Sequence, residues 1–186
     1  ELKNLGAQDV KVGVRNVSFV GDKGFMYKAN LGLRTAIKIL KPIKSFRVVS
    51  EQDLYEKVKA VSWENYLKSS GSLAIDATVH SHIFTHSQYI ALKTKDAIVD
   101  RFREKSGERP NVDLRFPDLK INIHIDRQLC TLSLDSSGES LHKRGYKTAT
   151  NIAPINEVLA AGLILLSDWD GQSNFMDPMC GSGTIL

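Results

Sequence analysis

The chain has 186 residues, 42% of them hydrophobic, and a formal net charge of +4. This length and apolar content are sufficient for one or two small domains, and the mild cation excess permits an anionic partner without requiring one. No apolar run reaches the roughly 18 residues of a membrane span, so we expect a cytoplasmic protein. Cys130 and Cys180 lie far apart, which is typical of a reducing compartment and not of a disulfide framework.

The first segment, residues 1–49, predicts a small α/β lobe. After a short helix that ends at Gly6, residues 10–19 alternate apolar and polar side chains, as a bulged hairpin does. Residues 22–33 follow as a capped helix, and residues 35–49 indicate a strand broken at a proline. This order suggests a ferredoxin-like lobe that is incomplete at its start.

The second segment, residues 50–147, predicts a larger α/β domain. Its periodicities indicate a helix over 50–61, a strand over 73–79, a helix over 87–105 and strands over 119–125 and 129–134. Trp63, Tyr66 and Leu67 are expected in its core. The alternating strands predict a sheet with one wet face.

The third segment, residues 148–186, differs from the rest. Residues 155–169 predict a helix that is apolar on nearly all sides and hence buried between layers. Residues 174–176 then indicate a strand, followed by a glycine-rich turn and a helix that begins at Thr184. Strand, glycine loop and helix form the arrangement that brings a backbone close to a nucleotide-like ligand. We therefore expect a fragment that ends where a nucleotide-type domain begins.

Several kinds of glycine loop compete for residues 177–184. A phosphate-binding Walker loop needs a lysine after its last glycine, and none is near. A dinucleotide fingerprint needs a third glycine where this chain has Leu186. An ordinary strand-to-helix turn is a further alternative. The sequence Asp-Pro-Met-Cys-Gly-Ser-Gly-Thr closely resembles the S-adenosylmethionine loop of class I methyltransferases.

Three segments together resemble one family. They are residues 111–113, residues 141–146 leading into 153–161, and the loop at 177–184; residues 87–100 also match. All resemble bacterial large-subunit ribosomal RNA guanine-N2 methyltransferases that carry an N-terminal THUMP domain. The resemblance covers nearly the whole chain.

The resemblance implies an α+β fold with three parts. These are a ferredoxin-like lobe at 1–49, an RNA-binding THUMP domain at 50–147, and the first helix and strand of a truncated Rossmann-like methyltransferase domain at 148–186. It also implies a cofactor, S-adenosylmethionine, held by Asp177, Pro178, Cys180, Gly181, Ser182, Gly183 and Thr184. The family's N-P-P-Y-type catalytic motif lies further along and is absent from these residues, so no catalytic residue is carried over. We expect the isolated chain to be inactive and to bind the cofactor weakly or not at all.

RNA contacts should be made mainly to phosphate and should therefore be salt-sensitive. The candidate residues are Lys93, Lys95, Arg101, Arg109, Arg115, Lys143, Arg144, Tyr146 and Lys147. Tyr146 is available for base stacking, although it could equally pack at a hinge. The alternative for each cation is an ordinary solvated surface.

Two other chemistries receive less support. His80 and His82 share a strand face near His86, but no Cys or paired acid stands at the spacing of a fourth metal ligand. We therefore interpret the three histidines as exposed polar positions and expect no metal. Cys180 has no basic partner in sequence, so we assign it to loop packing and not to nucleophilic catalysis.

Three functions remain open. The leading hypothesis is the RNA-binding front end of an enzyme that methylates guanine N2 of large-subunit ribosomal RNA. The alternatives are an adenine-N6-specific DNA methylase, because the cofactor loop does not distinguish bases, and a non-catalytic THUMP module. We favour RNA because the THUMP resemblance is independent of that loop. The oligomeric state is open, and the long apolar helix could pair with a second copy.

Overall fold

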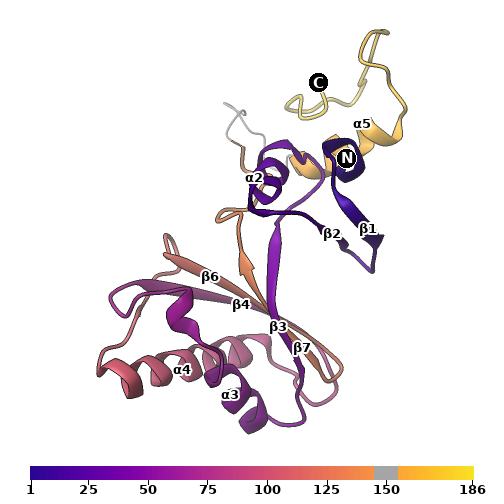
Figure 1. The fold of residues 1–186 in the computed structure, drawn as a ribbon. Helices are drawn as coiled ribbons and strands as arrows, with labels where there is room; N and C mark the ends of the chain where they lie inside the picture. The colour runs from indigo at the N-terminus through magenta and orange to yellow at the C-terminus, as the bar shows by residue number, and fades with distance from the viewer. Residues whose placement is uncertain (145–154) are drawn as a thin grey trace. The chain divides into compact units, whose positions relative to one another are not determined.

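The structure is a computed structural model that describes residues 1–144 and 155–186 (Figure 1). The chain forms two compact units. One unit combines Glu1–Ile39 with Ser137–Leu186, and the other is Leu40–Ser136. Among the described residues, no helix combines the length and the apolar character needed to cross a membrane.

The first unit contains α1 (Leu2–Leu5), β1 (Gln8–Val12), β2 (Val17–Val20), α2 (Lys23–Gly32) and α5 (Glu157–Leu166). The predicted hairpin is confirmed, because β1 and β2 pair antiparallel with an irregular register. Asp22 caps α2, since its Oδ1 accepts a hydrogen bond from the Phe25 N–H at 2.6 Å. Ala29, Leu33 and Ile39 form a small buried core in this unit.

The second unit is a five-stranded sheet with two helices. Its elements are β3 (Leu40–Arg47), α3 (Glu51–Lys59), the short 3₁₀ helix η1 (Trp63–Asn65), β4 (Ser72–His80), α4 (Ser87–Ser106), β5 (Asn111–Val112), β6 (Leu119–Asp126) and β7 (Leu129–Asp135). The strand order is β3-β7-β6-β4-β5. β4 runs parallel to β5 and β6, whereas β7 runs antiparallel to β6 and β3.

The core of the second unit lies between the sheet and α3 and α4, which cover one face (Figure 1). Ile121, Ile123 and Ile125 of β6 are fully buried, whereas the intervening Asn122 and His124 are partly exposed. The sheet therefore has one dry and one wet face, as the alternation predicted. Trp63 is fully buried and donates its Nε1–H to the carbonyl of Val58 at 2.8 Å. Tyr66, predicted as core, is 39% exposed instead.

The strand β3 lies in a different unit from the one expected. We predicted it as part of the N-terminal lobe, but its residues pair with β7 along its whole length, from Leu40 opposite Asp135 to Arg47 opposite Leu129. The register shifts between Pro42 and Lys44, where the proline cannot donate to the ladder. The strand predicted over 35–49 with a break at Pro42 is therefore shorter and continuous, and the proline marks an irregularity in its pairing.

The C-terminal segment departs from its prediction in three ways. Residues 174–176 form no strand and residues 184–186 form no helix, while α5 is shorter than expected. In α5 only Ala160 is buried, and Leu159, Leu163 and Leu166 are 44–82% exposed. The reason is that a strand needs a neighbour to pair with, and among the described residues none accompanies this segment. The predicted α+β class itself is confirmed.

Candidate functional site

The loop at residues 177–184 is built from two local turns. The Asp177 carboxylate accepts a hydrogen bond from the Met179 N–H at 2.9 Å, and the Gly183 N–H donates to the Cys180 carbonyl at 2.8 Å. Gly181 and Gly183 both adopt left-handed backbone conformations, with φ of 56° and 72°. Only glycine adopts these angles without strain, so the two glycines determine the shape of the loop.

The residues of this loop suit a nucleoside cofactor. A Cβ at Gly181 or Gly183 would meet nothing within 4 Å, so the backbone is open to a ligand on that side. Asp177 and Ser182 are partly exposed and offer a carboxylate and a hydroxyl to polar groups. The side chain of Cys180 is exposed, whereas Thr184 is buried. The donor set therefore fits S-adenosylmethionine, whose ribose and amino acid parts need such acceptors and donors.

A third turn, at residues 170–173, precedes the loop. The Asp170 carboxylate accepts from the N–H groups of Ser173 and Gln172, both at 2.9 Å, and these bonds hold the pKa of Asp170 below its ordinary value. The rings of Trp169 and Phe175 lie 5.1 Å apart across this turn. These contacts hold the backbone of residues 169–175 together just before the glycine loop.

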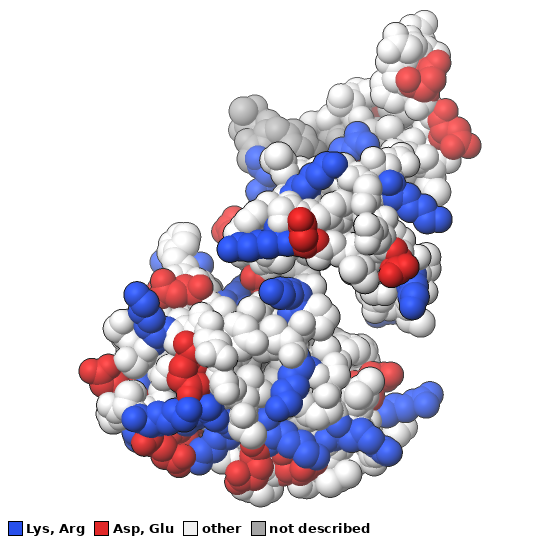
Figure 2. Space-filling view, viewed as in Figure 1, with Lys and Arg blue, Asp and Glu red and all other residues white. Residues whose placement is uncertain are grey.

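The predicted cations of α4 are engaged within the fold. The Lys95 Nζ lies 2.6 Å from the Asp96 carboxylate, and the Lys93 Nζ lies 5.2 Å from the centre of the Tyr55 ring. Figure 2 shows Lys and Arg interspersed with Asp and Glu over α3 and α4. A surface of mixed sign attracts a polyanion less than a continuous basic stripe does.

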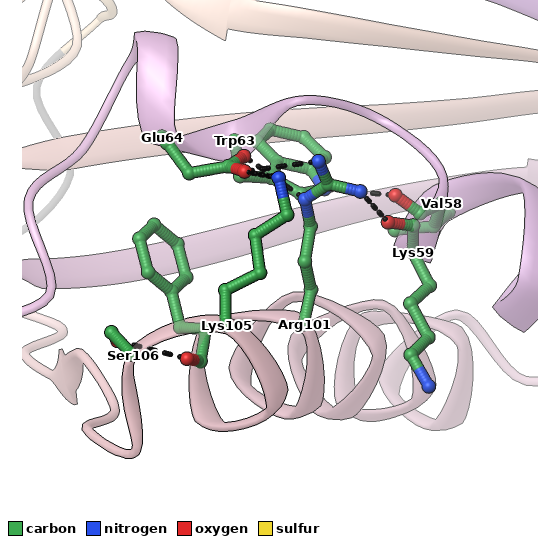
Figure 3. Close-up of polar contacts among 8 residues, drawn as sticks. Val58, Lys59, Trp63, Glu64, Arg101, Lys105 and Ser106 are labelled. Atoms are coloured by element: carbon green, nitrogen blue, oxygen red, sulfur yellow. Dashed lines mark hydrogen bonds and ion pairs between the residues drawn. The ribbon is translucent and has the colours of Figure 1, made fainter.

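Arg101, another candidate, is a structural residue. Its guanidinium forms two hydrogen bonds with Glu64, at 2.9 and 3.0 Å, and donates a third to the Lys59 carbonyl at 2.8 Å. Lys105 also pairs with Glu64 (Figure 3). The Arg101 and Lys105 hydrogen bonds lower the pKa of Glu64 to about 2. The side chain of Arg101 is 15% exposed and is therefore a poor phosphate ligand.

Arg144 also contributes to the fold. Its guanidinium donates to the carbonyls of Leu31 and Leu33, at 3.1 and 2.6 Å, and to that of Leu141 at 3.1 Å. These carbonyls include the end of α2, where a cation is favourable. Arg144 was predicted as an RNA contact, but in the structure its guanidinium binds backbone carbonyls within the first unit.

The other predicted RNA contacts differ in their surroundings. Arg109 and Arg115 are exposed on either side of β5, and Lys143 is exposed. Phe116, next to Arg115, is 81% exposed. Tyr146 and Lys147 lie outside the described residues.

The three histidines considered for a metal are not gathered into a site. The ring of His80 packs edge-on against His124, with 5.9 Å between centroids. Residues 1–144 and 155–186 contain no group of three or more His, Cys, Asp or Glu side chains arranged to hold a metal ion.

The structure reveals a hollow that the sequence prediction missed. It lies where β4 and β6 end, and it is lined by Arg47, His82, Arg127 and their neighbours, with a volume of about 810 Å³. Arg47 and Arg127 are far apart in the sequence, so no local pattern could join them. The one available signal was Arg127 itself, a cation between the strands predicted over 119–125 and 129–134.

Comparison with known families matches three consecutive domains. Residues 1–40 match the RlmL ferredoxin-like domain, residues 48–135 match the THUMP domain, and residues 144–186 match the RMKL-like methyltransferase domain. The chain is 43% identical, over its whole length, to the ribosomal RNA large subunit methyltransferase K/L of Syntrophotalea carbinolica, of which it covers 27%.

Two solved structures are similar over the entire chain. One is a predicted N6-adenine-specific DNA methylase from Listeria monocytogenes, with 36% identity and a TM-score of 0.85. The other is SMU.472, described as a methyltransferase complexed with SAH, with 35% identity and a TM-score of 0.84. The chain spans 48% and 49% of these two proteins. The chain therefore carries ferredoxin-like, THUMP and methyltransferase segments in the same order as these family models, and it corresponds to part of the length of its relatives.

Proposed function

We propose that this chain is the RNA-recognition part of an S-adenosylmethionine-dependent methyltransferase that acts on guanine N2 of large-subunit ribosomal RNA. One observation carries the proposal: the ferredoxin-like, THUMP and methyltransferase matches follow one another along the chain. The match of this whole chain to part of a protein named for ribosomal RNA methylation supports the RNA substrate.

The chain's own residues would have two tasks in this reaction. S-adenosylmethionine supplies a methyl group on a sulfonium, which the guanine amino nitrogen attacks. The loop at residues 177–184 would hold the cofactor, with Gly181 and Gly183 allowing close backbone approach and Asp177 accepting from its polar groups. The second unit would hold the RNA so that the guanine amino nitrogen lies in line with the methyl–sulfur bond of the cofactor. This positioning is a large part of such catalysis.

The proposed RNA contacts are those candidates whose side chains are exposed and form no hydrogen bond or ion pair within residues 1–144 and 155–186. Arg109, Arg115 and Lys143 have exposed side chains. Arg101 and Arg144 are withdrawn from the proposal because their guanidinium groups are bound to Glu64 and to backbone carbonyls.

The competing function is adenine-N6 methylation of DNA, the activity for which the similar Listeria monocytogenes protein is named. The decisive experiment incubates the full-length parent protein with labelled S-adenosylmethionine and either unmodified large-subunit ribosomal RNA or duplex DNA. Digestion to nucleosides should place the label in N2-methylguanosine from RNA. Label in N6-methyladenine from DNA would overturn the proposal.

The chain by itself should be inactive. Residues 155–186 contain no strand that could wall a cofactor pocket beside the glycine loop. Calorimetry with S-adenosylmethionine should detect weak binding or none, and micromolar affinity would contradict this expectation.

A further inference from the structure

We propose that the hollow at the end of β4 and β6 is a binding site for single-stranded RNA. Arg47 and Arg127 would bind a backbone phosphate there, and Ile83 and Leu129 would support a base. The inference rests on the proposed function and assigns its RNA contact to a surface other than α4. The volume of about 810 Å³ lies within the roughly 300–1,000 Å³ typical of ligand sites.

The walls of the hollow are held together by hydrogen bonds between segments that are distant in sequence but adjacent in the sheet. The Arg127 N–H donates to the His80 carbonyl at 2.7 Å, and the Ser81 hydroxyl donates to the Arg127 carbonyl at 2.5 Å. The Ile83 N–H donates to the same hydroxyl at 3.2 Å. These bonds tie the β6–β7 turn to the end of β4, so the site is organised before a ligand arrives and less ordering entropy is lost on binding.

The two arginines retain their capacity for an anion. Arg47 donates from Nη2 to the neutral Gln128 side chain at 2.8 Å, which leaves its charge uncompensated and most of its five N–H donors available. Arg127 is exposed, and within the parts of the chain that the structure describes its side chain forms no ion pair. This is the reverse of Arg101, whose charge is neutralised by Glu64. A guanidinium in this state suits a phosphate.

The rest of the lining suits a base. Ile83 and Leu129 are 44% and 50% exposed, and they give the hollow an apolar surface beside the cations. Asp126 is the acidic lining residue and can accept from an exocyclic amino group or a ribose hydroxyl. Duplex RNA is read by shape across successive grooves, so a single hollow of this size favours an unpaired nucleotide.

The position in the fold agrees with this assignment. β4 and β6 are parallel, and both end at the hollow, at His80 and Asp126. The crevice beyond the carboxyl ends of parallel strands is the usual place for a ligand in an open α/β sheet.

The test measures fluorescence anisotropy of a short labelled single-stranded RNA with the chain at low salt. The double variant Arg47→Gln, Arg127→Asn should raise the Kd at least about tenfold and should lower the salt slope by about 0.7 for one lost phosphate contact. Asparagine is chosen because Arg127 has a φ of 55°, which asparagine tolerates. The matched control is Lys68→Gln, an exposed cation before the opposite end of β4, which should leave the Kd unchanged.

A second pair of variants removes the apolar surface without touching charge. Ile83→Ser and Leu129→Ser should each weaken binding several-fold, while circular dichroism shows an unchanged fold. Wild-type affinity in the double variant, or an equal loss in the control, would overturn the site. Equal binding of single-stranded DNA of the same sequence would overturn the assignment to RNA. If the wild-type chain binds no RNA at low salt, the proposed function fails together with the site, whereas wild-type affinity in the double variant overturns the site alone.

Discussion

Arg101 and Glu64 form a two-pronged ion pair that joins α4 to η1, with Nε to Oε2 at 2.9 Å and Nη2 to Oε1 at 3.0 Å. The pair lies directly beside Trp63, which Glu64 follows in the chain, and Lys105 adds a second cation (Figure 3). Planar guanidinium and carboxylate groups in this geometry are stronger than a single surface contact. We therefore assign Arg101 to the stability of the second unit.

The first prediction concerns pH. The pKa of Glu64 is about 2 in the folded chain, below its ordinary value of 4.5, because Arg101 and Lys105 bind the ionised form. Its contribution to stability is therefore fully present above about pH 4.5 and is lost as the pH falls from there towards 2. Glu64→Gln should destabilise by about 1 kcal/mol at pH 7 and have little effect near pH 2. Urea unfolding at both pH values measures this, and an equal loss at both would contradict it.

The second prediction concerns the buried indole. Trp63 is fully buried, and its N–H is bound to the Val58 carbonyl. Trp63→Ala should cost about 3–5 kcal/mol because it leaves a cavity. Trp63→Phe should cost about 1–3 kcal/mol, since the Val58 carbonyl loses the indole donor, although it keeps the Val61 N–H at 3.1 Å, and the smaller ring leaves a gap. Denaturant unfolding would show this order, and Tyr66→Phe serves as the control because Tyr66 is 39% exposed.

The third prediction concerns the two thiols. Cys130 is buried, and burial raises its pKa to about 12, whereas Cys180 is exposed. A thiol reagent at pH 8 should therefore modify Cys180 quickly and Cys130 only after unfolding, because the thiolate is the reactive form. Mass spectrometry after timed quenching would count the labels. Fast labelling of Cys180→Ser protein would show that Cys130 is accessible after all.

The fourth prediction concerns the end of α2. Arg144→Gln removes the hydrogen bonds that the Leu31 and Leu33 carbonyls accept from the guanidinium. The free energy needed to open the end of this helix should therefore fall by about 1 kcal/mol. Hydrogen exchange of a peptide over residues 23–33 would detect faster exchange. The neighbouring Lys143→Gln, which changes an exposed cation, should leave this peptide unaffected.

The fifth prediction concerns the glycine loop in the full-length parent. Gly183→Ala places a side chain at a φ of 72°, which costs roughly 1–2 kcal/mol, so affinity for S-adenosylmethionine should fall about tenfold. Gly162→Ala lies in α5, where a Cβ would meet nothing within 4 Å, and should bind the cofactor normally. Equal affinity in both variants would argue against a role for this loop.

Local patterns predicted most of the elements. In α4, Ile90, Ala97, Ile98 and Phe102 recur at helical spacing and are all buried. The helix predicted to begin at residue 50 is confirmed as well, because the Ser50 side chain caps α3 and accepts from the Asp53 N–H at 3.1 Å. Apolar stripes and helix caps can be predicted because they depend on residues within about four positions of one another in the sequence.

What could not be predicted depends on partners that are distant in sequence. Arg101 and Arg144 resemble free cations until Glu64 and the end of α2 are placed beside them. The strand β3 has the same alternation whether it pairs in one unit or the other, so its membership follows from β7 alone. The domain boundaries after residues 49 and 147 stay predictions, as do the cofactor contacts and the remaining RNA contacts.

The pairing of Leu40 with Asp135 means that the chain enters and leaves the second unit at the same place. The second unit is therefore inserted into the first, with its two ends close together. The first unit continues at Ser137. Insertions with adjacent ends can be exchanged during evolution without stretching the host, because the gap to be bridged does not change. The same architecture would let the first unit keep its fold while the second unit is replaced by another domain.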